Sequence, residues 1–571
     1  MASQPWYASP SACQNGLSPN AAYPRWSSGR VDGGSMPTPH GTPDADLTRG
    51  PAEIAATFGE LWTRRVAASP AATFLVFQEL DHSTRTWTYE EFDKAVAAMA
   101  GYLTACGVLR GDAVHVALRN CPGFLAAWLA CARLGAWIVP VDPASGEREL
   151  ATQMERVKPR LGLYGATRSG AYRAAASQRG LEALELPESA EDILHVLAAG
   201  GGDSTAVSAD TTTLAPTDRL AVMFTSGTTS RPKGVVLTQA NYLNVAVTMS
   251  AAVDLGPDDR WLVTLPLFHA NAQYYCFAPA IAAGASVALT ARFSASRWTQ
   301  SARELRATHA SLFAAPIRMI LAKNPAGSRA NLKHVWFAQS LGADHYDEFA
   351  DLAGVRARQL YGMTETVAIV SADDPLNLSH DVIGKPLNGR RVRLIDPTTC
   401  AEAAPGENGV IQVAGERGVD LFVEYLDDPD TTNNSFTQSN GVTWFSTGDL
   451  AAAGADGTMR FVGRVDDVIK VSGENVSLTE VESTIAQAPG VLEAAVVAKP
   501  DPIRDQVPVA YVVPRDPATP PDVDALARWA ERELAPAARP REWHVIAELP
   551  RTSVGKVRRF AMAQFGPAPA R

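Results

Sequence analysis

A loop rich in hydroxyl groups, with two glycines and a lysine, is the strongest local sign of chemistry in the sequence. It reads Thr225-Ser-Gly-Thr-Thr-Ser-Arg-Pro-Lys-Gly234 and follows the apolar run 220–224, which we interpret as a central strand. Its glycines permit sharp turns and a close approach of a phosphate, and its lysine adds a mobile positive charge. The loop therefore predicts a phosphate site. It lacks the Gly-Lys-Ser/Thr ending of a Walker loop, and a polar hairpin-like loop is the alternative.

The same loop resembles the first signature of the adenylate-forming superfamily, which includes acyl-CoA synthetases, peptide-synthetase adenylation domains and firefly luciferase. The resemblance extends over most of the chain, from about Ala52 to Phe560. It implies ATP or AMP, Mg²⁺ and coenzyme A as ligands. The residues expected to hold the phosphates are Thr225, Ser226, Gly227, Thr228, Thr229 and Lys233.

Two further segments resemble nucleotide-binding signatures of the same family. Gln359-Leu-Tyr-Gly-Met-Thr-Glu-Thr366 resembles the second, in which an aromatic ring like Tyr361 stacks near the adenine, with Gly362 and Met363 beside it. The resemblance assigns the α-phosphate to Thr364 and Mg²⁺ to Glu365, since a carboxylate beside a triphosphate needs a cation to screen it. Ser446-Thr-Gly-Asp-Leu450 resembles the third signature. There Asp449 would accept hydrogen bonds from both ribose hydroxyls, and Arg464 would help from the other side.

The segment Leu265-Pro-Leu-Phe-His-Ala-Asn-Ala-Gln273 resembles the part of the family that forms the acyl pocket. His269 would gate this pocket, and Ser340-Leu-Gly-Ala343 would form another wall, with Gly342 and Ala343 also reaching the nucleotide. The expected pocket residues are His269, Ala270, Asn271, Gln273, Leu341, Gly342 and Met363. Their mostly small or apolar character suggests a neutral, fairly bulky organic acid.

Two motifs near the C-terminus resemble the mobile half of the family. In Gly463-Arg-Val-Asp-Asp-Val-Ile-Lys-Val-Ser-Gly-Glu-Asn-Val476, Asp466 matches the hinge. Lys470 and Gly473 would enter the site in the second step, where the glycine leaves room for a pantetheine arm. In Leu549-Pro-Arg-Thr-Ser-Val-Gly-Lys-Val-Arg558, Lys556 matches the catalytic lysine. It would bridge the carboxylate oxygen and the α-phosphate as negative charge builds.

These parts predict an enzyme, an ATP-dependent acid–thiol ligase. The carboxylate would attack the α-phosphate of ATP, give an acyl-AMP and release pyrophosphate, after which a thiol would displace AMP. The small domain would rotate about Asp466 between the two steps. The pocket string and Ser472-Gly-Glu-Asn475 most resemble the branch of carnitine and related acyl-CoA ligases, which favours free coenzyme A as acceptor.

Several alternatives stay open. A member that runs only one half-reaction, such as thioesterification of preformed acyl-AMP, is suggested by Ser230 and Leu341, which stand where the family often has glycine. An adenylating enzyme could instead load a separate carrier protein. A luciferase-like oxidase is not excluded by a simple motif. A non-catalytic nucleotide-binding regulator is the alternative from another class, and it would not need Glu365, Asp449, Arg464 and Lys556 together.

The elements that position these residues are helices that alternate with short apolar runs. This alternation predicts an α/β fold, with a large multi-layer N-terminal domain of mixed sheets. The helices expected there include 52–68 and 89–106. The strands expected there include 113–118, 137–141, 220–224, 261–265, 286–289 and 310–314. After residue 460 the pattern predicts a small mobile α+β domain. Its expected elements are the strands 468–471 and 494–498 and the helices 478–487 and 523–533.

Length and composition set the outer limits of this interpretation. The chain has 571 residues, which exceeds one ordinary domain, so we expect a large domain over 51–465 and a small domain over 466–571. Residues 1–50 are rich in Pro, Gly, Ser and Ala without sustained periodicity, which predicts a flexible leader. The formal net charge of −10 argues against a nucleic-acid partner. The six scattered cysteines predict neither a metal cage nor a disulfide framework, and no apolar window predicts a membrane span. A cytoplasmic monomer or homodimer that takes a small carboxylic acid, ATP and coenzyme A is the expectation.

Overall fold

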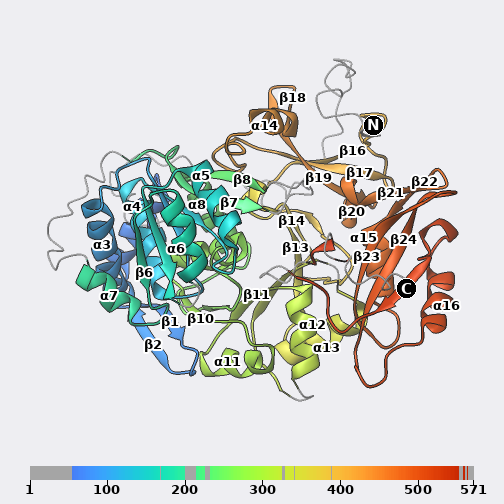
Figure 1. The fold of residues 1–571 in the computed structure, drawn as a ribbon, viewed down its shortest axis with the longest axis horizontal. Coiled ribbons are helices and arrows are strands. Elements are labelled where there is room, and N and C mark those ends of the chain that lie inside the picture. Colours follow the sequence, from blue (N-terminus) through green and yellow to red (C-terminus); the bar gives the residue numbers. More distant parts are fainter. Residues whose placement is uncertain are drawn as a thin grey trace, which may run out of the picture.

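The computed structural model describes residues 55–166, 169–199, 214–225, 232–324, 328–339, 341–387, 389–551, 557–559 and 562. A large N-terminal body carries a smaller C-terminal body at one end (Figure 1). The expected leader, the loop residues 226–231, Ser340 and Lys556 lie outside the described residues.

A nine-stranded sheet forms one layer of the large body. Its order is β15-β14-β13-β12-β11-β9-β10-β1-β2, and the five neighbour pairs between β13 and β1 are parallel. The strands are β1 Thr73–Gln78, β2 Thr84–Thr88, β9 Arg260–Val263, β10 Ser286–Thr290, β11 His309–Phe313, β12 His334–Ala338, β13 Arg358–Tyr361, β14 Ser371–Ala372 and β15 Lys385–Pro386. Because the inner strands are parallel, their carboxyl ends meet at one edge, where β13 delivers the second signature.

A six-stranded sheet forms the second layer, in the order β6-β5-β3-β4-β7-β8. All its pairs are parallel except the hairpin of β7 with β8. The strands are β3 Ala113–Ala117, β4 Trp137–Pro140, β5 Leu161–Gly165, β6 Ala183–Leu186, β7 Arg219–Thr225 and β8 Lys233–Thr238. This hairpin carries the first signature between its two strands.

Helices pack between and around the two sheets. The helix α4 is apolar on every side and buried along almost its whole length, which is typical of a helix enclosed between layers. A single hydrophobic core joins residues of both sheets with this helix. The helices of the large body are α2 Phe58–Ala68, α3 Tyr89–Ala105, α4 Pro122–Leu134, α5 Glu147–Val157, α6 Ser169–Gln178, α7 Asp192–Ala199, α8 Gln239–Ala251, α9 Ala270–Ala272, α10 Ala278–Ala283, α11 Trp298–Glu304, α12 Ala314–Lys323, α13 Ala343–Ala353 and α14 Pro429–Ser435.

A third sheet, drawn in orange at the top of Figure 1, links the layers to the small domain. Its strands are β16 Val392–Ile395, β17 Asn408–Ala414, β18 Phe436–Ser439, β19 Val442–Ala453 and β20 Met459–Arg464. The last strand ends at Arg464, and a short 3-10 turn, Val465–Asp467, leads into the small domain. The boundary predicted at Asp466 lies in this turn and stays a prediction.

The small domain combines one five-stranded sheet with two helices, as the C-terminal α+β pattern predicted. Its elements are β21 Val468–Val471, β22 Glu474–Ser477, α15 Leu478–Ile485, β23 Val491–Asp501, β24 Asp505–Pro514, α16 Val523–Glu533 and β25 Glu542–Val545. Ile485, Val496 and Val512 belong to a separate hydrophobic core of this domain. A core of its own is what allows such a domain to move as a body.

The sequence-based expectation of the fold class is confirmed, with two corrections. The strand β8 was not expected between the phosphate loop and the helix capped by Thr238, although that cap is present on α8. Cys400 is disulfide-bonded where no disulfide framework was expected, whereas Cys106, Cys121, Cys131 and Cys276 are free. Among the described residues, no helix combines the length and the apolar character that crossing a bilayer requires.

Candidate nucleotide and acyl site

The hairpin β7–β8 holds the two ends of the phosphate loop together. Thr225 pairs with Lys233 across the hairpin, and the Thr225 hydroxyl donates to the Lys233 carbonyl at 3.5 Å. Arg156, which sequence reasoning missed, stabilises the start of β8. It donates to the carbonyls of Pro232 at 2.6 Å and Leu426 at 2.7 Å. The structure thus fixes where the loop leaves and rejoins the sheet. The four expected ligands between these ends, Ser226, Gly227, Thr228 and Thr229, lie outside the described residues.

Tyr425 contacts both Lys233 and Glu365, and it is a second residue that sequence reasoning missed. The Lys233 ammonium lies 4.8 Å from the centre of the Tyr425 ring, and the Tyr425 hydroxyl donates to Glu365 Oε1 at 3.1 Å. Tyr425 also forms a backbone bridge with Val235, which anchors it to the hairpin. One tyrosine therefore joins the expected phosphate lysine to the expected Mg²⁺ ligand. No periodic pattern or motif marked this position.

The turn that carries Glu365 is held in a conformation that few residues adopt. It is a 3-10 turn over Thr364–Thr366, after which Val367 has φ 63°. A β-branched residue at positive φ is strained and needs support from its surroundings. Arg390 supplies this support by donating to the carbonyls of Thr366 and Ala368, and it also binds the carbonyl of Asp420. Arg390 was missed as well, because no motif distinguishes it from the neighbouring arginines Arg391 and Arg393.

Tyr361, Asp449 and Arg464 form a second connected group. The Tyr361 hydroxyl donates to Asp449 Oδ2 at 2.7 Å, and Arg464 Nη1 lies 2.9 Å from Asp449 Oδ1. Asp449 and Arg464 are opposite each other on neighbouring antiparallel strands. Both carboxylate oxygens are thus held, and each retains lone pairs for a further donor such as a ribose hydroxyl. The stacking of adenine on Tyr361 stays a prediction, since its ring is largely buried near Phe461.

The two groups balance charge in a site that is largely shielded from water. Burial raises the pKa of Glu365, which is 4% exposed, while Tyr425, Lys233 and Arg464 oppose that rise. Burial alone would lower the pKa of Arg464, but Asp449 and its acidic neighbours raise it overall. A buried carboxylate whose charged form is disfavoured gains from a divalent cation beside it. The residues therefore fit a Mg²⁺–nucleotide complex. Within the described ranges, no three acidic, histidine or cysteine side chains could hold a metal by themselves.

The acyl-pocket segment begins a helix that contains a π-turn. His269 precedes α9, and the next residues form the π-helical stretch Gln273–Phe277 before α10. Such π-turns occur often at functional sites. Asn120, which sequence reasoning missed, holds the preceding loop by donating to the carbonyls of Leu265 and Thr290 at 3.1 Å and accepting from the Leu267 N–H at 2.9 Å.

The two expected amides of this segment differ in what they offer a ligand. Asn271 donates to the Ser311 hydroxyl at 2.9 Å, but its buried Oδ1 has no hydrogen-bond partner among the described residues. Gln273 is fully buried, accepts from the Tyr242 hydroxyl at 2.6 Å and donates to the Leu267 carbonyl at 2.7 Å. The Gln273 amide is thus used within the protein, and the expectation that this residue lines the acyl pocket stays a prediction. His269 and Ala270 are only half-buried at the start of the segment.

The expected second wall of the pocket stays a prediction. Leu341 is 2% exposed and belongs to a hydrophobic cluster with Phe337 and Tyr346. Gly342 precedes α13, whose first residue, Ala343, is exposed. The expectation that Gly342 and Ala343 reach the nucleotide stays untested.

The second-signature residues Gly362 and Met363 lie where the acyl and nucleotide segments meet. A Cβ on Gly362, the residue after β13, would come within 2.9 Å of the Tyr275 hydroxyl, so any side chain here would force Tyr275 of the π-turn to shift. Met363 and Thr364 are half-buried beside this contact. These residues therefore connect the two halves of the candidate site.

The segment expected to serve the second step lies on the surface of the small domain. Lys470 is on β21, and the turn to β22 has Ser472 at φ 52° and Gly473 at φ 90°. A two-residue hairpin turn with both φ positive favours glycine at its second position. A Cβ on Gly473 would meet nothing within 4 Å. In this orientation the glycine therefore serves the turn, and the predicted contact with pantetheine requires the small domain to move.

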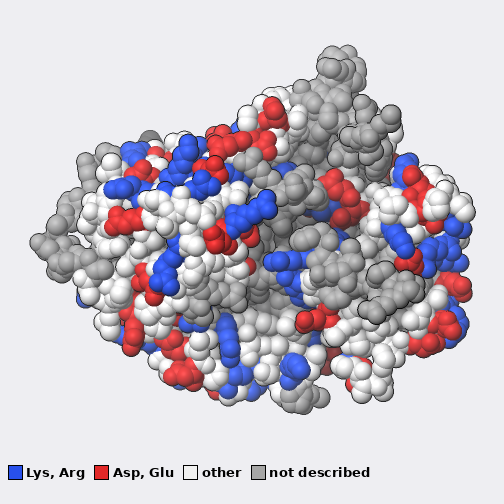
Figure 2. All heavy atoms as spheres, in the orientation of Figure 1, with Lys and Arg blue, Asp and Glu red and all other residues white. Residues whose placement is uncertain are grey.

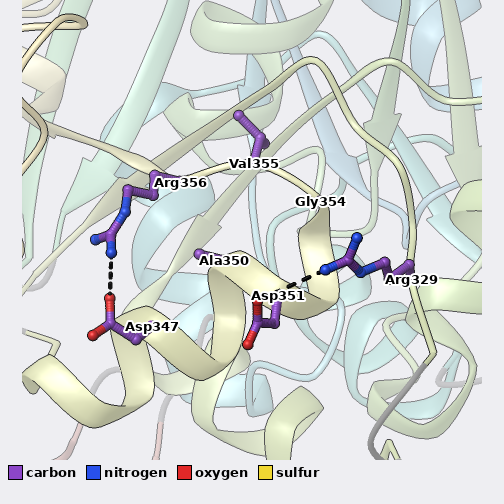
Figure 3. Close-up of a pocket in the computed structure, with 7 residues that line it drawn as sticks. All are labelled: Arg329, Asp347, Ala350, Asp351, Gly354, Val355 and Arg356. Atoms are coloured by element: carbon purple, nitrogen blue, oxygen red, sulfur yellow. Dashed lines mark ion pairs between the residues drawn. The ribbon is translucent and has the colours of Figure 1, made fainter.

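Two surface hollows lie away from these groups. The first, of about 420 Å³, is at the end of α13 and is lined by Arg329, Asp347, Ala350, Asp351, Gly354, Val355 and Arg356. Figure 3 shows its charges paired with each other, Arg356 with Asp347 at 2.9 Å and Arg329 with Asp351 at 3.8 Å. The second, of about 460 Å³, lies beside β2 and α11. On the face drawn in Figure 2, basic and acidic side chains are interspersed and form no single basic field. Neither hollow contains a signature residue.

Comparison with known proteins places these groups in context. A family model described as AMP-binding enzyme matches residues 62–425, and one described as AMP-binding enzyme C-terminal domain matches residues 480–556. A crotonobetaine/carnitine–CoA ligase of Salmonella arizonae is 30% identical, over 87% of this chain and 97% of that protein. The corresponding ligase of Proteus mirabilis is 29% identical over the same shares.

Solved structures show the same fold. The anthranilate CoA ligase AuaEII in complex with anthranoyl-AMP has a TM-score of 0.80 at 21% identity, over 90% of this chain and 98% of that chain. A benzoate CoA ligase from Burkholderia xenovorans LB400 has a TM-score of 0.77 at 20% identity, over 89% and 99%. At these identities the likeness concerns the fold alone.

Proposed function

The chain belongs to the AMP-binding enzyme family, and from that premise we propose that it activates an organic carboxylic acid as an acyl-AMP and transfers the acyl group to coenzyme A. The expected reaction class, an ATP-dependent and AMP-forming acyl-CoA ligase, is confirmed by this membership together with relatives named as CoA ligases.

The convergence of side chains from segments far apart in the sequence is the observation that carries the proposal. Lys233, Tyr425 and Glu365 form one connected group, and Tyr361, Asp449 and Arg464 form the other. The charges of Lys233 and Arg464 both act on Glu365, so the two groups lie within electrostatic reach of each other. A nucleotide carries its ribose hydroxyls next to its phosphate chain, which matches a carboxylate–arginine pair beside a lysine and a cation ligand.

In the first half-reaction, a carboxylate oxygen of the acid attacks the α-phosphorus of ATP, and the bond to pyrophosphate breaks. Asp449 would hold the ribose and Lys233 the departing phosphates, while Thr364 would orient the α-phosphate. Mg²⁺ held by Glu365 would neutralise phosphate charge. Lys556 is proposed to contact the reacting oxygens.

In the second half-reaction, the sulfur of coenzyme A attacks the acyl carbonyl and AMP leaves with the bonding electrons. Lys470 and Gly473 are proposed to approach after rotation about Asp466. The same hold on the ribose by Asp449 would serve both steps, because AMP is present in both. Free coenzyme A is proposed as the acceptor, and a separate carrier protein is the alternative.

The acyl side of the site favours an acid without a second charge. His269, Ala270 and Asn271 supply an imidazole, a methyl group and an amide, and Asn271 Oδ1 is the buried acceptor that a ligand donor could use. A substrate ammonium group would need a carboxylate partner, which this segment lacks. We propose a neutral, fairly bulky organic acid, a monomer or homodimer as the working form, and the cytoplasm, which supplies ATP and coenzyme A, as its location.

A two-part assay over a panel of organic acids tests this function. Pyrophosphate release with ATP, Mg²⁺ and acid but no thiol measures the first step, and thioester formation from synthetic acyl-AMP and coenzyme A measures the second. The proposal predicts both for at least one acid. Activity in the second assay alone would establish the half-reaction alternative, and a thioester formed only with a carrier protein would replace coenzyme A as acceptor.

A further inference from the structure

The hollow beside β2 and α11 carries an excess of positive charge. Figure 1 shows these two elements at the lower edge of the large domain. Three arginines line the hollow, Arg260, Arg297 and Arg306, and Glu304 is the acidic residue among its described lining residues. Three positive charges therefore stand against one negative charge. The hollow at the end of α13 differs, because there each of two arginines is paired with an aspartate (Figure 3).

The carboxylate of Glu304 is already occupied by partners outside the centre of the hollow. Its Oε2 lies 3.3 Å from Arg297 Nη2, and its Oε1 accepts from the Gln300 amide at 2.6 Å. The charge of Arg297 is compensated in this way. Among the residues that the structure describes, Arg260 and Arg306 have no carboxylate partner. Burial and the charge of Arg306 both lower the pKa of Arg260, so an anion between the two arginines would stabilise both.

Neutral groups hold Arg260 next to the turn that carries Arg306. Arg260 Nε donates to the Ser286 hydroxyl at 2.9 Å, and its Nη1 donates to the carbonyl of Leu305 at 2.8 Å. Its Nη2 donates to none of the described residues and is available to a ligand. Arg306 follows at the end of α11 with φ 53°, and its N–H donates to the Arg303 carbonyl at 3.1 Å. Two guanidinium groups are thus placed beside one hollow before any ligand binds.

Uncharged donors on the neighbouring sheet face the same hollow. Thr84 lies opposite Gln78 across the β1–β2 pair, and Thr86 lies opposite Val76, so all four share one face. Gln78 is 3% exposed, and its Oε1 accepts from the Ser301 hydroxyl at 3.0 Å. Its Nε2 donates to no described residue, although a buried amide N–H without a partner is costly. The amide and the two hydroxyls therefore offer hydrogen bonds to a ligand.

We propose that this hollow binds a phosphate group, either as inorganic phosphate or as part of a small phosphorylated molecule, between Arg260 and Arg306. Guanidinium groups bind phosphate oxygens through paired N–H donors, and the amide and hydroxyls would bind the remaining oxygens. The volume of about 460 Å³ lies in the range of roughly 300 to 1,000 Å³ that is usual for small-molecule sites. Val76 and Leu305 add apolar surface for the rest of such a molecule. The site is separate from the nucleotide groups and does not depend on the proposed catalytic function.

Hydrogen–deuterium exchange with two probes tests the site directly. Inorganic phosphate and phenyl phosphate would each be added at ten times the measured dissociation constant, with potassium chloride at equal ionic strength as the reference. Exchange in residues 82–86 and 304–308 should slow by up to about tenfold with phosphate and stay unchanged with chloride. Tighter binding of phenyl phosphate would identify a phosphorylated molecule as the ligand, and equal or weaker binding would identify free phosphate. Residues 219–238 report separately on phosphate bound at the candidate nucleotide site.

Substitutions at Arg306 decide whether the arginines carry this binding. Arg306 is exposed and contacts the rest of the chain through its backbone, so the variants should fold. Arg306→Gln should weaken the dissociation constant about tenfold, and Arg306→Glu should abolish the protection of residues 82–86. Arg356→Glu is the matched control, because Arg356 is an exposed arginine of the charge-balanced hollow. It should leave the protection intact. Protection that persists in Arg306→Glu, or that chloride produces equally, would overturn the inference.

Discussion

The side chains proposed to bind the nucleotide are already held by partners in this structure, whereas the β21–β22 hairpin of the small domain is exposed. Tyr425 binds the Glu365 carboxylate, Tyr361 and Arg464 bind that of Asp449, and both carboxylates are largely shielded from water. At the hairpin, Ser472 and Gly473 are exposed, and a Cβ on Gly473 would meet nothing within 4 Å. On the proposed mechanism, a preorganised site would bind nucleotide in either domain orientation, whereas the hairpin would act only after the small domain has moved.

The largest expected effect comes from breaking the preorganised side. Asp449→Ala removes the partner of both Tyr361 and Arg464. The protein would therefore lose its proposed hydrogen bonds to the ribose of the nucleotide in each step. Both pyrophosphate release and thioester formation from acyl-AMP should fall by roughly 100-fold. Steady-state rates of the separate half-reactions check this. Asp456→Ala, at an exposed turn of the same sheet, should change neither rate. Loss of only one half-reaction in Asp449→Ala would contradict a shared nucleotide site.

The next effect should be confined to the hairpin. Gly473→Val forces a β-branched residue to φ 90°, which distorts the turn and fills the space proposed for pantetheine. Thioester formation should slow by a factor on the order of 10 to 100, with adenylation unchanged. Gly457→Val is matched, because Gly457 has φ 82° in another exposed turn with nothing within 4 Å of its added Cβ. A decrease in adenylation with Gly473→Val would show that the hairpin already acts in the first step.

A smaller decrease in the adenylation rate is expected from a substitution at Tyr425. Tyr425→Phe keeps the ring under Lys233 but removes the hydroxyl that lowers the pKa of Glu365. The pKa of Glu365 should therefore rise, and the acidic limb of the adenylation pH profile should move to higher pH. Loss of a hydrogen bond to a charged group should reduce the rate about tenfold near neutral pH. Tyr511→Phe in the small domain is the control, and an unchanged acidic limb would contradict the assignment.

The smallest effect on catalysis is expected from the scaffold below the site. Burial lowers the pKa of His309 to about 4 and that of His115 to about 3, so both are neutral in the folded protein. In the unfolded chain these histidines take up protons below the ordinary histidine pKa of about 6.5. The free energy of unfolding should therefore fall as the pH drops from 6.5 towards 4. For His309 the shift corresponds to roughly 3 kcal/mol.

Thermal unfolding between pH 7 and 4.5 checks this dependence. His309→Gln should show a shallower loss of melting temperature than the wild-type chain. A steeper loss in the variant would contradict the assignment. The half-reaction rates measured at neutral pH should change little, because His309 lies on β11 in the core, where it is paired with Trp261 and His334.

Much of the fold followed from periodicity, and much of the candidate site from resemblance. The strand β21 and the helix α16 have the bounds that the pattern predicted, because each is a short, cleanly amphipathic or apolar segment. The strand β8 was missed because Gly234-Val-Val-Leu237 is short and lies between a loop motif and a helix cap.

The residues that support the site were the hardest to predict. Tyr425, Arg390, Asn120 and Arg156 all act through contacts with segments far along the chain, and none belongs to a local motif. Asn120, for example, binds Leu267, which is 147 residues away. Such contacts exist only in the folded chain. Motifs therefore identified groups that would touch ligand, whereas the structure identified the groups that hold them.

Detection of the intermediate itself tests the central claim most directly. The wild-type chain would be incubated with ATP, Mg²⁺ and each acid of a panel, with and without coenzyme A, and the products identified by mass. We predict an enzyme-bound acyl-AMP without coenzyme A, and its replacement by acyl-CoA and AMP when coenzyme A is added. Acyl-CoA formation with ADP and phosphate as the products, or no acyl-AMP with any acid, would contradict the account.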